Sequence, residues 1–134
     1  MSISLSQVHI LIDDPDAALG FYRDALGLKV QHEVANEGFR WITLVTDSQP
    51  EIGIVLFETH AGRSQADGDA IAALLAKGEL SPIHLRTDDL DAVFAKASAA
   101  PGAEVLQEPD TRPWGVRDCA VRDPAGNLLR IQQL

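Results

Sequence analysis

The chain has 134 residues, of which 46% are hydrophobic, and this length suffices for one domain with a buried core. Its 11 basic and 20 acidic residues give a formal net charge of −9, which argues against nucleic acid as a partner, because such binding depends on lysine and arginine neutralising phosphates. No apolar run reaches the roughly 18 residues of a membrane span, and the first residues, MSISLSQ, lack the basic start and apolar core of a secretory signal.

Cysteine usage limits both the covalent framework and the metal chemistry. Cys119 is the single cysteine, so no intrachain disulfide and no thiolate zinc cluster can form. A chain without disulfides is typical of a reducing compartment, and we therefore expect a cytoplasmic protein. Within its apolar surroundings Cys119 is expected to be buried and inert.

The first predicted element is a short β-rich strand over residues 8–12. Asp14 and Pro15 then provide an N-cap and a proline in the first helical turn, and apolar residues at helical spacing predict a helix that ends at Gly27. Three further strands follow, over residues 28–34, 39–45 and 52–57.

The same order of elements returns after a polar stretch (60–68) and a short helical run (70–76). A strand is predicted over residues 83–87, then a helix that Asp89 caps and Gly102 ends. The remaining strands are predicted over residues 104–107, 116–121 and 128–131.

Shifting the sequence by 75 positions exposes an internal duplication. Over residues 6–33 the identical pairs are Ser6/Ser81, His9/His84, Asp13/Asp88, Asp14/Asp89, Asp16/Asp91, Ala17/Ala92, Ala25/Ala100, Gly27/Gly102, Val30/Val105 and Glu33/Glu108. The sequence therefore predicts an α+β fold in which two tandem βαβββ modules form a cupped, partly closed mixed sheet. Module one spans residues 5–59, a linker with a short helix spans 60–79, and module two spans 80–134, all within a single domain.

Two segments carry a resemblance to a known family: DDPDAALGFYRDALGL in the first half and RDPAGNLLRI near the end. The duplicated βαβββ unit with these segments resembles the vicinal oxygen chelate superfamily, which includes glyoxalase I, extradiol dioxygenases, fosfomycin resistance enzymes and bleomycin-binding resistance proteins. The resemblance covers nearly the whole chain and implies a cup that holds ligand or metal. It also implies a homodimer, with cups completed across the interface.

The resemblance places the four metal-ligand positions of the family on Gln7, near Val55, on Pro82 and on Arg130. Valine and proline have no donor side chain, and arginine brings a permanent positive charge to the place of a divalent cation. We therefore predict that the usual metal site is absent and that the protein has no cofactor.

A shifted metal site is the alternative. His9 and His84 each lie two residues beyond a lost ligand position, and residues two apart on a strand share a face, about 6–7 Å apart. With Gln132 and Glu58 they would hold one divalent metal ion and support a metal-dependent lyase, isomerase or dioxygenase. The competing interpretation is that both histidines are hydrogen-bonded or ligand-contacting residues of the cup lining.

The segment RPWGVRDCAVRDPAGNLLRI is similar to the C-terminal segment of the bleomycin-binding resistance proteins. Those proteins bind a bulky, cationic, aromatic antibiotic and do not alter it chemically. Trp114, Trp41 and Phe57 are candidates for stacking against such a guest. Either tryptophan is alternatively a core residue. Arginines 117, 122 and 130 would instead favour a carboxylate or phenolate. We expect Arg130 to replace the cation electrostatically or to pair with a carboxylate such as Glu58.

The leading hypothesis is a small-molecule-binding protein without the usual metal, and whether it is also an enzyme stays open. Its expected partners are a small, aromatic or antibiotic-like molecule and a second copy of the chain, with neither nucleic acid nor membrane. A degenerate cup that associates with another protein is a third possibility. The predicted ligand-binding residues are His9, Trp41, Phe57, His84, Trp114, Arg117 and Arg130.

Overall fold

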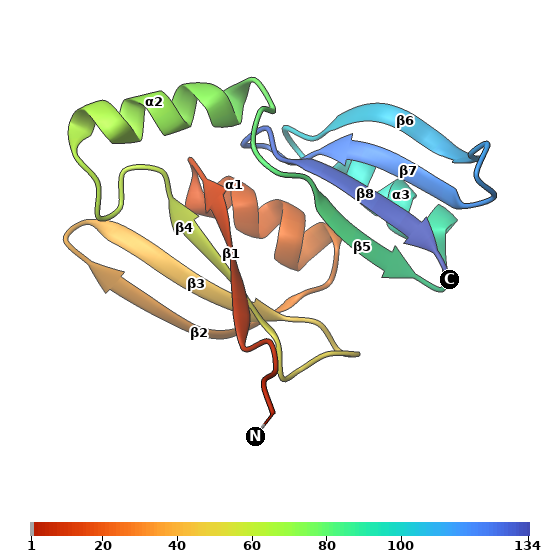
Figure 1. Cartoon of the computed structure of the whole chain (residues 1–134), viewed down its shortest axis with the longest axis horizontal. Coiled ribbons are helices and arrows are strands. Elements are labelled where there is room, and N and C mark those ends of the chain that lie inside the picture. The colour runs from red at the N-terminus through yellow and green to blue at the C-terminus, as the bar shows by residue number, and fades with distance from the viewer. Residues whose placement is uncertain (1) are drawn as a thin grey trace.

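Two four-stranded mixed sheets frame the protein in a computed structural model that describes residues 2–134 (Figure 1). The strand orders are β1-β4-β3-β2 and β5-β8-β7-β6, with the outer pairs β1/β4 and β5/β8 parallel and all other pairs antiparallel. The strands are β1 (Gln7–Ile12), β2 (Lys29–Asn36), β3 (Phe39–Val45), β4 (Gly53–Glu58), β5 (Ile83–Thr87), β6 (Glu104–Thr111), β7 (Arg117–Arg122) and β8 (Leu128–Gln133). The predicted α+β fold of two βαβββ modules is confirmed, with two separate sheets that do not close into a barrel.

The helices of the two modules begin where the sequence predicts them, whereas the helix between the modules begins at Gln65, before the predicted run 70–76, with Ser64 as its N-cap. The side chain of Asp14 accepts from the backbone N–H groups of Asp16 and Ala17, and that of Asp89 accepts from Ala92, so both aspartates are N-caps. The first helix starts as α1 (Pro15–Leu19) and continues as a π-helical segment, η1 (Gly20–Ala25), while α2 (Gln65–Ala76) follows module one and α3 (Leu90–Ala99) belongs to module two.

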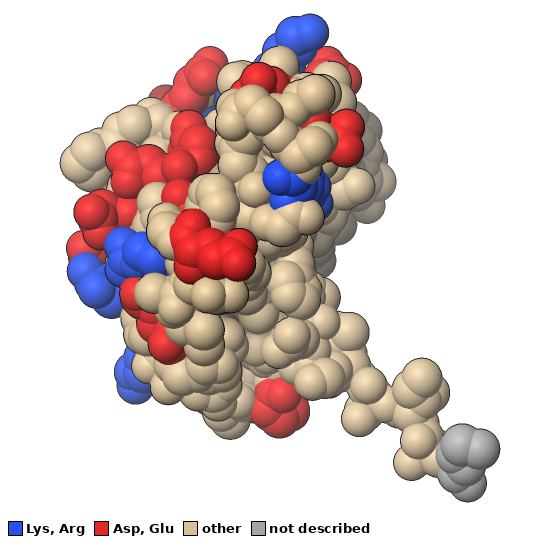
Figure 2. All heavy atoms as spheres, turned by 90° about the vertical axis from the view of Figure 1, so that its left-hand side faces the viewer, with Lys and Arg blue, Asp and Glu red and all other residues tan. Residues whose placement is uncertain are grey.

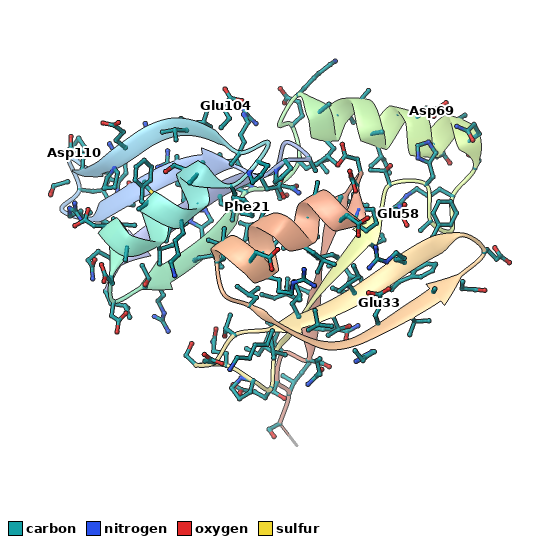
Figure 3. All side chains as sticks on the ribbon, turned by 180° about the vertical axis from the view of Figure 1, so that it is seen from behind. Phe21, Glu33, Glu58, Asp69, Glu104 and Asp110 are labelled. Atoms are coloured by element: carbon teal, nitrogen blue, oxygen red, sulfur yellow. The ribbon has the colours of Figure 1, made fainter. Side chains whose placement is uncertain are left out.

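Each sheet has one covered face and one open face. Figure 1 shows the sheets in front of α1 and α3, and Figure 3 shows both helices from behind. Ile10, Ile12 and Leu56 point toward the helices and are buried in the main core, whereas His9, which directly precedes Ile10, is exposed. This alternation follows from the two-residue period of a strand, and it leaves the front of both sheets as the open faces.

Helix α2 follows module one in the chain and lies above its strands, at the top left of Figure 1. At its end, Gly78 has φ of +75°, and a Cβ there would lie 1.6 Å from Nη1 of Arg122. The guanidinium of Arg122 donates to the carbonyl of Gly126, 3.1 Å away, in the turn before β8. The positive φ therefore favours glycine at position 78, and a side chain there would also displace the guanidinium of Arg122.

The turn between β7 and β8 is organised by the buried carboxylate of Asp123, which is 2% exposed. Its Oδ1 accepts three backbone N–H groups, from Ala125 at 3.0 Å and from Gly126 and Asn127 at 2.9 Å. Its Oδ2 accepts the side-chain amide of Asn127 at 2.9 Å. The DPAGN segment is thus a turn built around one acceptor.

This turn also joins the two modules. The Tyr22 hydroxyl of η1 donates to Oδ2 of Asp123 at 2.6 Å, and the Asn127 amide donates to the Leu11 carbonyl of β1 at 2.8 Å. Burial, and then the charge and hydrogen bond of Asp123, raise the pKa of Tyr22 well above its usual value. The two sequence segments that carry the family resemblance therefore meet in one buried network.

Among residues 2–134, no helix is long and apolar enough to cross a membrane.

Tyr22 predicts a specific alkaline response, which can be followed without interference because it is the single tyrosine of the chain. Its folded-state pKa lies above the ordinary value of 10.0, so the unfolded chain releases this proton at lower pH than the folded chain. The contribution to stability is therefore complete below about pH 10 and is lost as the pH rises above it. We expect tyrosinate absorbance to appear together with unfolding, and Tyr22→Phe to weaken this alkaline loss of stability. Tyrosinate formation near pH 10 in the folded protein would contradict the buried bridge.

Candidate functional site

An aromatic surface occupies the open face of module one. Trp41 of β3 stands opposite Phe57 of β4, and Phe57 lies edge-on to His9 of β1, with ring centroids 5.4 Å apart and planes at 88°. Val55, the strand neighbour of His9, is 4% exposed yet lies outside the main core, as expected for a residue beneath this surface. His9, Trp41 and Phe57 are hereafter the aromatic platform.

A pocket of about 270 Å³ adjoins the platform where module one meets the segment leading into β5. His9, Leu11 and Phe57 line one side, and Leu80, Ser81 and Ile83 line the other. The guanidinium of Arg63 lies 5.6 Å from the centre of the Phe57 ring, a cation–π distance. Figure 2 shows the open side in profile, at the right, as a hollow with mostly uncharged residues, while many acidic side chains gather on the opposite side.

The open face of module two has a different chemistry. Asp118 of β7, whose side chain is 8% exposed, accepts from Nε of Arg112 at 2.6 Å and from Nη1 of Arg130 at 3.2 Å. The same Nη1 of Arg130 donates to the Gln107 amide oxygen at 3.1 Å. One carboxylate between two guanidiniums leaves a local positive charge. Arg112, Asp118, Arg130 and Gln107 form the arginine cluster.

Arg130 pairs with a carboxylate, as expected, but Glu58, the carboxylate given as the example, is wrong. Glu58 follows Leu56 by two residues and points to the helix-covered side, where its carboxylate accepts from the backbone N–H of Arg40 at 2.8 Å. Figure 3 shows Glu58 on that side, near α1. Glu58 is therefore not on the face of His9, and the carboxylate that Arg130 contacts is Asp118.

The other predicted residues are distributed over both faces of module two. His84 is the strand neighbour of Arg130 and is exposed, and Gln132 stands opposite Arg86 and Asp118 on the same face. Arg117 instead donates to Asp91 of α3 at 2.8 Å, on the helix-covered side. The structure thus brings His84, Gln132 and Arg130 to one face and separates Arg117 from them.

Trp114 lies in the turn between β6 and β7 and is 67% exposed. The alternative that Trp114 is buried in the core is therefore wrong. In this single chain Trp114 belongs to the opposite module from the aromatic platform, and a role in ligand binding stays a prediction. Trp41, by contrast, is half-buried within the platform.

The residues at the family's metal positions do not suit a divalent cation. Val55 offers no donor atom, and Arg130 places a guanidinium, already hydrogen-bonded to Asp118 and Gln107, at the fourth position. Within residues 2–134, no three His, Cys, Asp or Glu side chains are grouped as metal ligands. For the shifted site, Glu58 cannot join His9. Phe57 shares the open face with His9, and the next residue of a strand, here Glu58, points to the opposite face.

Several members of these surfaces were not expected from the sequence. Arg112 and Gln107 reach Asp118 and Arg130 across the β6–β7 hairpin, and Arg63 approaches Phe57 from the loop before α2. The alternating pattern of β7, with Asp118 and Ala120 on the face away from α3, is the signal in the sequence that places Asp118 beside Arg130.

The comparisons with known proteins agree with the fold of the chain. A model of the Glyoxalase/Bleomycin resistance protein/Dioxygenase superfamily matches residues 4–131, and the chain belongs to this superfamily. The solved structure of UcmS2 is 27% identical, with a TM-score of 0.86 and 100% of both chains covered. That of TnmS3, an antibiotic binding protein from Streptomyces sp. CB03234, is 25% identical, with a TM-score of 0.72 and coverage of 99% of this chain and 98% of that chain. Uncharacterized protein YwbC of Bacillus subtilis (strain 168) is 25% identical over 99% of each chain.

Cys119 is expected to be unreactive in the folded protein. Its side chain is fully buried in β7, and burial, followed by the charge of Asp118, raises the pKa of its thiol. A thiol reagent such as dithionitrobenzoate should label the folded protein very slowly and the urea-unfolded protein rapidly, with one equivalent per chain. Rapid labelling of the folded protein at neutral pH would identify Cys119 as a nucleophile and contradict its buried position.

Proposed function

We propose that the protein binds a small, planar aromatic molecule, of the kind found in antibiotics, without the usual metal site of its superfamily and without changing the molecule. The aromatic platform is the single observation that carries this proposal. The similarity to TnmS3, an antibiotic binding protein, supports the same class of ligand.

The platform suits aromatic ligands for physical reasons. Trp41 and Phe57 offer large apolar surfaces on neighbouring strands, and an aromatic ligand can stack or lie edge-on against them. His9, Ser81 and Asn127 supply polar groups in an otherwise apolar pocket, the combination that orients a small molecule.

A second copy of the chain is part of the proposal. In the single chain the open faces are uncovered, and Val34, the neighbour of Trp41 on β2, is 51% exposed. A homodimer that lays an open face of one copy against that of the other would turn two shallow faces into closed cups. The single buried thiol suits a reducing compartment such as the cytoplasm for this dimer.

The dimer predicts a solution mass of twice the 14.5 kDa of one chain, measured by light scattering after size exclusion. Since Val34 lies on the face to be covered, Val34→Asp should shift the protein toward a single chain, while Leu74→Asp on the exposed side of α2 should not. A mass of one chain at micromolar concentration would contradict the closed cup.

Binding is tested by calorimetry with a neutral probe, 2-naphthamide, followed by mass spectrometry of the recovered compound. We expect saturable binding of about one probe per chain and recovery of the probe unchanged. Trp41→Ala and Phe57→Ala should each weaken binding about tenfold or more, because each removes a stacking surface. Leu74→Ala, an exposed apolar truncation on α2, is the matched control and should change binding less than about twofold. Binding unaffected by both platform variants would refute the proposed site.

The proposal also predicts the metal content. Protein purified without chelator or affinity tag should contain far less than one transition-metal ion per chain by elemental analysis, and EDTA should leave probe binding unchanged. Near-stoichiometric metal that is lost in His9→Ala or His84→Ala would instead favour the metal-dependent lyase, isomerase or dioxygenase. Such a result would overturn the proposal that the protein binds its ligand without a metal ion.

A further inference from the structure

We propose that Arg130 is an anion receptor, and that the ligand of the cup carries a carboxylate, or an equivalent flat oxyanion, on its aromatic body. This inference rests on the proposed function and specifies the chemical class of the ligand. Its basis is the unused edge of the Arg130 guanidinium, together with the charge around it.

The hydrogen bonds of Arg130 involve one of its three nitrogens. Nη1 donates to Asp118 and to Gln107, which hold the guanidinium in place. Among the described residues 2–134, no acceptor meets the N–H groups of Nε and Nη2. These two nitrogens form the side edge of the guanidinium, whose parallel N–H groups match the two oxygens of a carboxylate.

The position of Arg130 leaves this edge accessible. Its two strand neighbours on the open face are His84 on β5 and Ala120 on β7, and alanine is too short to cover a guanidinium. The Arg130 side chain is 30% exposed, whereas the Arg112 side chain on the other side of Asp118 is 14% exposed. Arg130 is thus the more accessible guanidinium of the arginine cluster.

The local charge opposes that of the whole protein. On the open face, strands β5, β7 and β8 carry one acidic residue, Asp118, against three arginines, Arg86, Arg122 and Arg130, while Arg117 points to α3 and pairs with Asp91. The other acidic residues of this sheet lie on its edge strand, β6, and Figure 3 shows Glu104 and Asp110 near its two ends. A chain of net charge −9 therefore presents a positive centre in the middle of the open face of module two.

The departure from the family's metal site has a chemical consequence. Where the resemblance expects a ligand for a cation, this chain has Arg130, a fixed cation. A metal in such a cup attracts oxygen anions of its guest, and a guanidinium attracts the same groups through charge-assisted hydrogen bonds. In the proposed dimer, the aromatic platform of one copy holds the ring system and Arg130 of the second copy holds the oxyanion.

The test compares two probes of nearly equal shape, 2-naphthoate and 2-naphthamide, by calorimetry with wild-type protein and three variants. Wild type should bind 2-naphthoate about 10- to 100-fold more tightly than 2-naphthamide. Arg130→Gln should abolish this preference, because it weakens binding of 2-naphthoate far more than binding of 2-naphthamide. Arg130→Lys keeps the charge beside Asp118 but loses the paired N–H groups, so it should retain a reduced preference. Arg23→Gln removes an exposed arginine on η1, which pairs with Asp24, and should behave as wild type.

Each outcome decides between the two proposals. Equal binding of both probes by wild type, or an unchanged preference in Arg130→Gln, overturns the anion receptor and leaves aromatic binding intact. Failure of wild type to bind either probe overturns both proposals. Because Arg130 also contacts the buried Asp118, the melting temperature of each variant is measured, and a folded Arg130→Lys that keeps the full preference also counts against the paired hydrogen bonds.

Discussion

The buried carboxylate of Asp123 is the interaction on which the arrangement of the molecule depends. It organises the turn before β8 through three backbone N–H groups and receives the Tyr22 hydroxyl from the other module. A buried acceptor of this kind is costly if its donors are lost, so the turn and the helix of module one are held in one relative position. Asn127 extends the same link to β1 through the Leu11 carbonyl.

The helices and the Asp123 turn lie on one side of the sheets, where the modules are joined. The other face of each sheet is therefore open. Duplication has given these faces the same backbone and different side chains. Module one presents His9, Trp41 and Phe57, while module two presents Arg130 over Asp118. The pair His9 and His84 keeps the same place in each module, but Phe57 is the aromatic neighbour of His9 and Arg130 is the neighbour of His84. An aromatic ligand with an anionic group matches both faces at once.

The sequence predicts the repeated order of elements, the caps at Asp14 and Asp89 and the burial of Cys119, because these depend on local patterns and on strand periodicity. It does not predict that Tyr22 and Asp123 meet, since 101 residues separate them. The mistaken pairing of Arg130 with Glu58 has a related cause, because the face of a residue near a strand end depends on a register that composition leaves open. Contacts between strands far apart in sequence require the three-dimensional structure.

The most direct test of the central claim uses the two tryptophans as separate reporters. Their indole N–H resonances can be assigned with Trp41→Phe and Trp114→Phe and followed by NMR while 2-naphthoate is added. The proposed cup predicts a large, saturable shift of the Trp41 resonance, whose affinity agrees with calorimetry and weakens in Arg130→Gln. A Trp41 resonance that stays in place while the probe binds would contradict the assignment of the aromatic platform as the ligand site.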